Sequence, residues 1–134
     1  MYLLDTCILI DLIRGRSSVQ NSLSKIGLHN CCTAETCIAE LYVGAYKTQS
    51  KLQFQQIEWL ESKLTALPLS GSLRTYAQIR ALLEQKGMRI EDTDLFIAAV
   101  ALDHDLTLVT HNTRHFGRIP GLRVEDWCRP QGQL

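Results

Sequence analysis

The sequence has no excess of charge of either sign. Its 134 residues include 14 Lys plus Arg and 14 Asp plus Glu, so the formal net charge is zero. This balance excludes a histone-like polycation, although it allows a nucleic-acid enzyme whose basic residues surround an acidic centre. Proline and glycine are few, at 3 and 8 residues, and 46% of the chain is hydrophobic. This usage is typical of a globular domain and excludes a disordered or fibrous chain.

Long hydrophobic runs are also missing. No apolar segment reaches the roughly 18 to 20 residues that a membrane helix needs. The first residues, Met-Tyr-Leu-Leu-Asp, lack the basic segment with which a signal peptide begins. We therefore expect a cytoplasmic protein that does not contact a membrane.

The cysteines form no CxxC pair, which disfavours a redox or zinc role. The five cysteines are Cys7, Cys31, Cys32, Cys37 and Cys128. Several lie inside apolar segments, so we interpret them as reduced thiols packed in the core. A zinc site that uses His111 and His115 is disfavoured, because the residues between them are turn-like and no third ligand is evident.

The hydrophobic pattern alternates between short apolar runs and longer segments of helical period. Strands are predicted over residues 2–4, 30–33, 65–69, 106–109 and 122–124, and helices over 7–13, 17–26, 34–47, 51–64, 70–86 and 95–102. This alternation indicates an α/β fold with a parallel sheet that helices cover on both faces. No internal repeat or linker divides the chain, so we expect one domain over residues 1–134, with a flexible tail at the last few residues.

Particular positions make this prediction testable. Pro68 cannot donate a hydrogen bond to a sheet, which indicates that its strand ends there or lies at an edge. The helix over 95–102 is apolar nearly all round and is expected in the middle of the fold. Tyr46 and Leu52 follow the apolar positions of their segments and are therefore expected to point inward.

Acidic residues stand in apolar surroundings at three places. Asp5 follows the first strand, Glu40 lies inside the apolar segment 37–43, and Asp94 begins the buried helix. An unpaired carboxylate removed from water costs several kcal/mol. No Lys or Arg lies within several residues of Asp5 or Glu40 on the expected helical faces, so a shared divalent cation is the simplest partner. Oxygen ligands favour Mg²⁺ or Mn²⁺ over zinc, and the carboxyl ends of parallel strands bring such residues together.

Structural roles are the alternative for each of these acids. Asp5 can cap the following helix, Glu40 can bond a buried hydroxyl, and Asp94 in a first helical turn favours the helix dipole. For Asp92 we prefer the helix cap. The acids that we interpret as solvated or turn charges are Asp11, Asp103 and Asp105.

Polar residues after the strand at 106–109 are candidates for a supporting role. Thr110 and Asn112 can add hydroxyl and amide oxygens to the site, or can be ordinary loop residues. Basic residues that can contact phosphate, or be plain surface charge, are Arg89, Arg114, Arg118 and Arg123.

Four segments together carry a resemblance to a known family. They are LLDTCILIDLI at the start, AELYVGAYKTQ in the third helix, IEDTDLFIAAVAL before a strand, and LTLVTHNTRHFGRIPGLRVEDW near the end. The chain resembles PIN-domain ribonucleases, in particular the VapC toxins of bacterial toxin-antitoxin pairs, over nearly its whole length. The resemblance implies a three-layer α/β/α sandwich around a parallel sheet, that is, a single PIN domain.

The resemblance also implies a site and an activity, that of an Mg²⁺- or Mn²⁺-dependent endoribonuclease. Asp5, Glu40 and Asp94 match the three acids of the family motif, while Thr6 and Thr110 match small hydroxyl positions near the site. Our hypothesis is that the three acids hold one Mg²⁺, which orients water for attack on an RNA phosphodiester.

The sequence departs from the family pattern at Asn112, where many members carry a fourth acid. A neutral amide binds a metal ion more weakly than a carboxylate does, so one or two metal ions remain possible. Asp92 has no firm counterpart in the motif, although its closeness to the site could partly compensate. RNA contacts are expected from Arg114, Arg118 and Arg89.

Partners follow from the resemblance as well. It implies a homodimer whose paired sites face a groove for structured RNA, with tRNA as the substrate class. It further implies that the toxin inhibits translation until a cognate VapB-type antitoxin binds it in a larger hetero-oligomer.

Two other classes of function compete with this interpretation. A phosphotransferase with an aspartyl-phosphate would need a second Asp where Cys7 stands, or a Lys after a later strand, and neither is present. A catalytically idle binding module would keep the fold without needing Asp5, Glu40 and Asp94, so the presence of all three argues against it.

Overall fold

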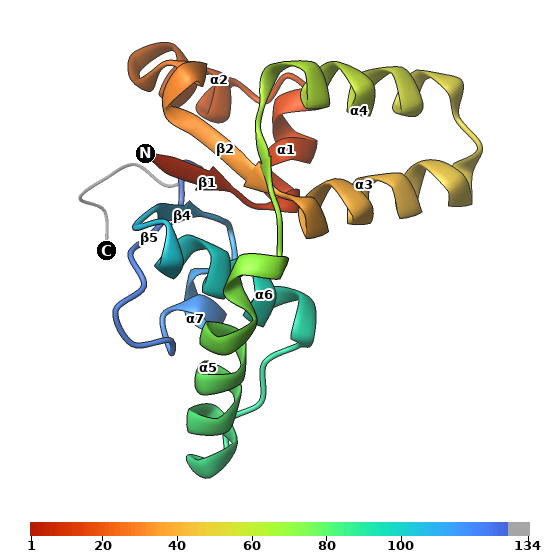
Figure 1. Cartoon of the computed structure of the whole chain (residues 1–134). Helices are drawn as coiled ribbons and strands as arrows, with labels where there is room; N and C mark the ends of the chain where they lie inside the picture. Colours follow the sequence, from red (N-terminus) through yellow and green to blue (C-terminus); the bar gives the residue numbers. More distant parts are fainter. Residues whose placement is uncertain (129–134) are drawn as a thin grey trace.

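A parallel β-sheet lies at the centre of the structure, a computed structural model that describes residues 1–128 (Figure 1). The spatial order of its strands is β3-β2-β1-β4-β5, and every pairing is parallel. The strands are β1 (Tyr2–Leu4), β2 (Cys31–Ala34), β3 (Ala66–Leu67), β4 (Thr107–Val109) and β5 (Val124–Glu125). The edge position of β3, just before Pro68, is confirmed. The tail expected at the last few residues lies outside the described residues.

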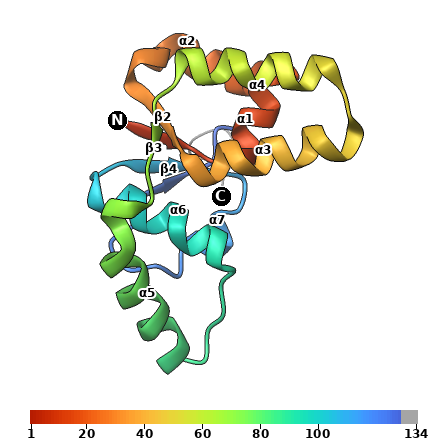
Figure 2. The same ribbon diagram turned by 45° about the vertical axis from the view of Figure 1, so that its right-hand side comes forward.

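Helices cover both faces of this sheet. They are α1 (Thr6–Ile13), α2 (Ser17–Ile26), α3 (Glu35–Thr48), α4 (Lys51–Lys63), α5 (Leu73–Gln85), α6 (Asp92–Asp103) and α7 (Thr113–Phe116), with 3-10 turns at Leu28–Asn30 and Ser70–Ser72. Helices α1, α2 and α4 lie on one side of the sheet, and α5, α6 and α7 on the other (Figures 1 and 2). This arrangement confirms the predicted α/β/α sandwich. Within residues 1–128, no helix is both long enough and apolar enough to cross a membrane.

The helix boundaries have local causes. The carboxylate of Asp5 accepts the N–H of Thr6 at 2.8 Å and so caps α1, as a helix N-cap does. Two helices end where glycine adopts a left-handed or otherwise positive φ, at Gly15 (74°) after α1 and Gly27 (87°) after α2. Residues with a side chain are strained in this region of φ, so glycine suits both positions.

The core forms between the sheet and the helices that cover it. As predicted, α6 is the most buried helix, and its buried residues are Leu95, Ile97, Ala98, Ala99, Val100 and Ala101. The largest fully buried side chain is that of Phe116 in α7. Helix α6 packs against α5 and β4, and its first turn brings Asp94 to the pocket that Asp5 lines at the end of β1.

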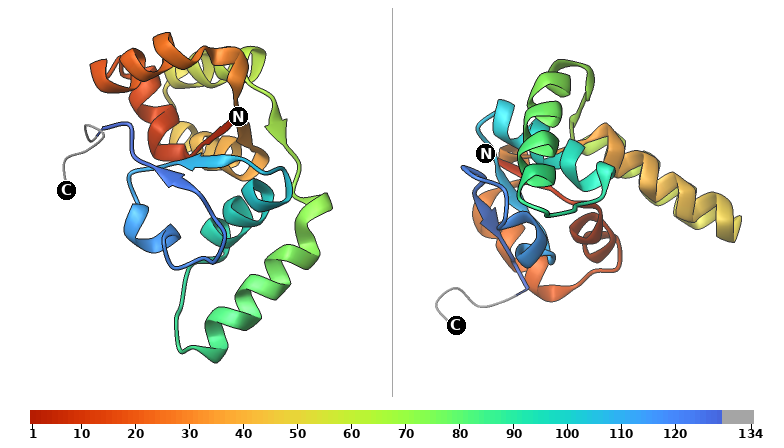
Figure 3. Two further views of the ribbon diagram at one scale, coloured as in Figure 1. Left: turned by 90° about the vertical axis from the view of Figure 1, so that its left-hand side faces the viewer. Right: turned by 90° about the horizontal axis from the view of Figure 1, so that it is seen from below.

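Two predictions about local structure were wrong. Tyr46 and Leu52 are 70% and 62% exposed, although they follow the apolar positions of α3 and α4. These two helices run antiparallel and extend beyond the sheet, so nothing in residues 1–128 covers their far ends (Figures 1 and 3). The sequence analysis also assigned no helix to α7, because four residues are too few to show a helical period.

Candidate active site

The carboxyl ends of β1 and β4 meet where the candidate site forms. Asp5 comes directly after β1 and donates its backbone N–H to the carbonyl of Val109, the last residue of β4, at 3.0 Å. Thr110 follows β4 and lies beside Asp5. Helix α3, which leaves the end of β2, brings Glu40, and the first turn of α6 brings Asp94. One pocket is lined by Asp5, Thr6, Cys7, Ile10, Glu40, Asp94, His111 and Asn112.

Asp5 is the most rigidly held of these acids. It is 7% exposed, and both of its carboxylate oxygens accept hydrogen bonds. Oδ1 accepts from the backbone N–H of Thr6 at 2.8 Å, and Oδ2 accepts from the hydroxyl of Thr110 at 2.7 Å. These donors fix the orientation of the carboxylate, which is therefore presented to the pocket in one geometry.

Burial and the negative charges around the pocket make the other two acids, Glu40 and Asp94, harder to ionise. Burial, together with the negative charges of Asp5, Glu40 and Glu91, raises the pKa of Asp94 to about 6. Burial, with the charges of Asp5 and Glu91, also raises the pKa of Glu40. Carboxylates that resist ionisation because they face one another are stabilised by a cation placed between them.

The residues present therefore fit a divalent cation. Three carboxylates, those of Asp5, Glu40 and Asp94, line one pocket. An all-oxygen donor set suits Mg²⁺ or Mn²⁺. Asp5, Glu40 and Asp94 are the residues that would hold the ion.

Comparison with known proteins shows the family of the chain. The sequence profile of the family described as PIN domain matches residues 2–122. The chain belongs to the PIN-domain family. It is 35% identical over 131 residues to "Ribonuclease VapC2" of Rickettsia felis, an alignment that covers 95% of this chain and 98% of that protein.

Two further relatives extend the comparison of this PIN domain. The "tRNA(fMet)-specific endonuclease VapC" of Shigella flexneri is 33% identical over 128 residues, covering 94% of this chain and 97% of that one. The structure titled "Crystal structure of VapBC2 from Rickettsia felis bound to a DNA fragment from their promoter" superposes with a TM-score of 0.81 at 33% identity. That match covers 94% of this chain and 98% of the other. Within the PIN-domain family, the chain therefore groups with the VapC ribonucleases of toxin-antitoxin pairs.

The structure separates Asp92 from the other predicted site residues. Asn112, Thr6 and the three acids line the pocket of the PIN domain, and Thr110 contacts Asp5 directly. The carboxylate of Asp92 instead accepts a hydrogen bond from the hydroxyl of Tyr76 at 2.8 Å and pairs with Arg80 at 3.4 Å. The predicted cap at Asp92 was also wrong, because Glu91 occupies the N-cap position of α6.

The predicted basic residues lie at the surface of the PIN domain. Arg89, Arg114 and Arg118 are exposed, and none of them forms a salt bridge with another residue in the range 1–128. Arg123 pairs with the exposed Asp105 at 3.0 Å. The first three guanidinium groups therefore keep their donors available for phosphate.

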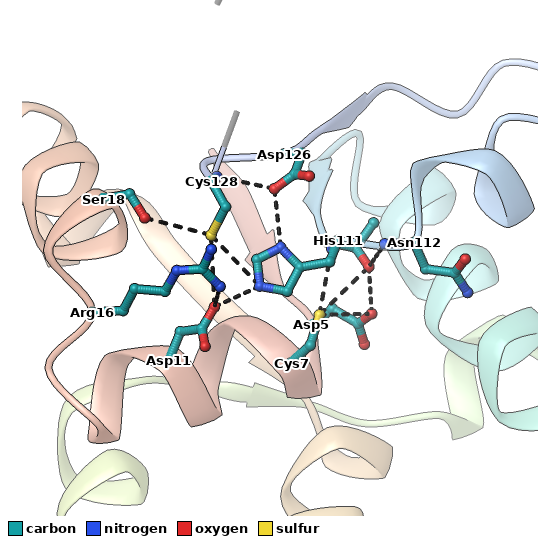
Figure 4. A network of polar contacts seen from close by, with 10 residues as sticks. Asp5, Cys7, Asp11, Arg16, Ser18, His111, Asn112, Asp126 and Cys128 are labelled. Atoms are coloured by element: carbon teal, nitrogen blue, oxygen red, sulfur yellow. Dashed lines mark hydrogen bonds and ion pairs between the residues drawn. The ribbon is translucent and has the colours of Figure 1, made fainter. Parts of the chain in front are cut away.

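Other residues at the site escaped the sequence analysis. Asp11 was predicted as a solvated charge, but it contacts His111 and Cys128 beside the pocket (Figure 4). Burial lowers the pKa of His111, but its hydrogen bonds to Asp126 and Asp11 outweigh that effect and leave the pKa raised. No short-range pattern signals these contacts, because the partners come from α1 and from the segments after β4 and β5.

Replacing Thr110 by Val should weaken both the fold and the activity of the PIN domain. The hydroxyl of Thr110 is fully buried, donates to Asp5 at 2.7 Å and accepts from the N–H of Asn112 at 3.1 Å. We expect a loss of about 1–3 kcal/mol in the free energy of unfolding, because a buried carboxylate loses its donor. Ribonuclease activity should fall about 10- to 100-fold, since supporting groups of a metal ligand typically count that much.

Urea unfolding and cleavage assays on Thr110→Val and Thr110→Ser check this expectation. Serine keeps the hydroxyl, so Thr110→Ser should retain most of the activity. If Thr110→Val matches the wild type in both assays, the hydroxyl does not orient Asp5.

Proposed function

We propose that this PIN domain is an Mg²⁺- or Mn²⁺-dependent endoribonuclease toxin that hydrolyses phosphodiester bonds of structured RNA, with tRNA as the substrate class. The observation that carries the proposal is the convergence of Asp5, Glu40 and Asp94 on one pocket at the carboxyl ends of the strands. The names of the relatives support the choice of RNA, since one is a tRNA(fMet)-specific endonuclease. By cutting tRNA in the cytoplasm, the protein would inhibit translation.

The bound ion would contribute Lewis acidity at the pocket, activating water and neutralising charge on the phosphodiester. Asp5, Glu40 and Asp94 would hold it, and the hydrogen bonds from the backbone N–H of Thr6 and the hydroxyl of Thr110 keep Asp5 in position. Asn112, at the rim of the same pocket, positions water or phosphate through its amide.

Basic side chains near the pocket bind the RNA backbone in this proposal. Arg114 lies on α7 and Arg118 follows it, so both are close in sequence to Asn112 at the pocket. Their exposed guanidinium groups bind phosphates on either side of the cleaved bond, as arginine does in protein–RNA contacts. Arg89, in the exposed segment before α6, extends this contact.

A VapB-type antitoxin is the proposed partner, in a hetero-oligomer built on a homodimer of this chain. The structural neighbour from Rickettsia felis is a VapBC complex, which supports this partner. Exposed apolar side chains of α3 and α4 also favour a protein contact. They are Val43, Tyr46, Leu52 and Trp59.

The decisive experiment is cleavage of a total tRNA pool by the purified protein. With Mg²⁺ or Mn²⁺ we expect discrete fragments that disappear in EDTA and in the Asp5→Ala variant, because the carboxylates then lack either the ion or one of its ligands. An internal control is Asp103→Ala, whose carboxylate is exposed and accepts from Thr75 at 2.7 Å. Uncut tRNA in every condition would contradict the proposed substrate, and fragments that persist in EDTA would contradict the metal dependence.

A further inference from the structure

A second group of metal-ligating side chains lies beside the carboxylate pocket and is not used by the proposed nuclease. It consists of Asp11 on α1, His111 after β4 and Cys128 after β5, with one potential ligand atom of each within 4.8 Å of the others (Figure 4). The Sγ of Cys128 lies 3.6 Å from both the Nε2 of His111 and the Oδ2 of Asp11. We call these three residues the Asp-His-Cys cluster.

Both ring nitrogens of His111 face a carboxylate. Nδ1 lies 3.0 Å from Asp126 and Nε2 lies 2.5 Å from Asp11. A neutral imidazole carries one N–H, so it can donate to only one of these acceptors. If Nδ1–H donates to Asp126, the lone pair of Nε2 points at the carboxylate of Asp11. A proton or a metal ion must then lie between Nε2 and Asp11.

The two distances from the sulfur of Cys128 suit a tetrahedral metal ion. With metal–sulfur bonds of about 2.3 Å and metal–nitrogen or metal–oxygen bonds of about 2.0 Å, tetrahedral angles separate sulfur from the other ligands by about 3.5 Å. The two distances from Cys128 Sγ, both 3.6 Å, match this separation. The contact between Nε2 and Asp11 is shorter, as expected when a proton joins them, and must open by about 1 Å for an ion of this size.

The chemistry of the donors selects the ion. A thiolate, an imidazole and a carboxylate together favour Zn²⁺, whereas Mg²⁺ prefers oxygen ligands alone. Asp126, which contacts Nδ1 of His111, supplies the carboxylate that usually orients a zinc-binding histidine.

Two further polar groups lie next to the cluster. They are Arg16, 3.2 Å from Asp11, and Ser18, 3.5 Å from Cys128. Arg16 is half exposed and can move away, which leaves the fourth position to water or to the Ser18 hydroxyl.

We propose that Asp11, His111 and Cys128 bind one Zn²⁺ at a site distinct from the catalytic carboxylates. Binding releases the thiol proton of Cys128 and any proton on Nε2 to solvent, and the ion takes their place. Because the ligands lie 100 and 117 positions apart from Asp11 along the chain, the ion ties α1 to the segments after β4 and β5. The site also adjoins the catalytic pocket, since the N–H of His111 donates to Cys7, which lines it.

Cobalt is the probe for this site, because Co²⁺ occupies zinc sites and reports its ligands by absorption. The full chain is stripped of metal and titrated with Co²⁺ in excess Mg²⁺, which occupies the carboxylate pocket. We expect one equivalent of Co²⁺ to give intense visible bands of tetrahedral coordination and a near-ultraviolet band from thiolate to cobalt. Adding Zn²⁺ should displace Co²⁺ and so remove the visible bands and the near-ultraviolet band. Zn²⁺ should also raise the melting temperature of the wild type.

Matched variants assign the ligands. Cys128→Ser should lose the thiolate band, and His111→Gln should bind Co²⁺ at least about 10-fold more weakly. Cys31→Ser removes a thiol that donates its hydrogen bond to the carbonyl of Gly27 rather than to the cluster. This variant should keep the wild-type spectrum. Asp94→Asn should also keep it, which separates this site from the proposed catalytic one. Circular dichroism shows which variants are folded. If Cys128→Ser does not fold, the affinity of His111→Gln for Co²⁺ tests the proposal instead.

Three results would overturn the proposal. The first is a wild-type titration with weak bands of octahedral cobalt and no thiolate band. The second is a thiolate band that persists in folded Cys128→Ser, because another cysteine is then the ligand. The third is an unchanged spectrum and affinity in His111→Gln. None of these results bears on cleavage of tRNA, so they leave the proposed nuclease untouched.

Discussion

Replacing Asp94 by Asn should abolish metal-dependent cleavage of tRNA while making the metal-free protein more stable. The carboxylate of Asp94 is one of three acids at the pocket, and an amide is a much weaker ligand for Mg²⁺. An ion that activates water and neutralises phosphate contributes several kcal/mol to catalysis. Its loss therefore corresponds to a fall of about 10³-fold or more in rate.

The gain in stability follows from repulsion at the same pocket. Burial and the charges of Asp5, Glu40 and Glu91 raise the pKa of Asp94 to about 6. The ionised side chain thus costs free energy in the folded state. After solvent screening at this partly exposed position and the loss of a favourable helix-dipole contact, Asp94→Asn should add about 1 kcal/mol to the free energy of unfolding at pH 7.5.

The pH dependence has a definite sign. Because the pKa of Asp94 is higher in the folded than in the unfolded protein, the folded state binds more protons between its ordinary value of 3.8 and about 6. The stability contributed by protonation is present at low pH and is lost as the pH rises through about 6. The advantage of Asp94→Asn over the wild type should therefore be complete above this value and shrink as the pH falls below it.

Thermal unfolding in EDTA and in Mg²⁺, with cleavage assays alongside, tests both halves of this prediction. Mg²⁺ should raise the melting temperature of the wild type but not that of Asp94→Asn. The matched control is Asp105→Asn, which removes the same charge from a side chain that is 89% exposed and paired with Arg123. Full Mg²⁺-dependent cleavage by Asp94→Asn would remove Asp94 from the catalytic site.

The arrangement of the carboxylate pocket could be predicted because its causes are local. Asp5 interrupts an apolar sequence at the end of a strand, and Asp94 begins a helix that is apolar on every side. Once the strands are parallel, their carboxyl ends must share one edge of the sheet, and the acids meet there. The sequence therefore indicated both the α/β/α fold and the residues that converge.

The Asp-His-Cys cluster could not be predicted in the same way. His111 and Cys128 reach Asp11 only because β4 pairs beside β1 and β5 pairs beside β4. The strand order comes from long-range packing, which the hydrophobic period of a single segment does not contain. The exposure of Tyr46 and Leu52 has a similar cause, since it depends on where the sheet ends and not on the pattern within α3 or α4.

Replacing Phe116 by Ala should have the largest effect on stability. Phe116 is the largest fully buried side chain and belongs to α7, the short helix that sequence analysis missed. Removing a buried phenyl ring costs about 3–5 kcal/mol, because apolar contacts are lost and a cavity remains. Since domains of this size are stable by only about 5–15 kcal/mol, the melting temperature should fall by about 10 °C or more.

Two further variants show whether the loss of stability in Phe116→Ala comes from lost buried volume or from the loss of an aromatic ring as such. Phe116→Leu keeps much of the buried volume and should cost far less than Phe116→Ala. Tyr46→Ala removes an exposed ring whose aromatic contact is with Phe54, at 4.9 Å between ring centroids, and should cost no more than about 1.5 kcal/mol. Urea unfolding of the three variants in EDTA measures these differences without a contribution from bound metal.

The same variant links the core to the catalytic site. The backbone N–H of Phe116 donates a hydrogen bond of 3.3 Å to the carbonyl of Asn112, which lines the pocket. Arg114, proposed to bind phosphate, lies on the same turn. We therefore expect folded Phe116→Ala to cut tRNA more slowly at saturating Mg²⁺, with a higher KM for RNA. An unchanged KM would show that α7 stabilises the sheet without positioning the RNA-binding groups.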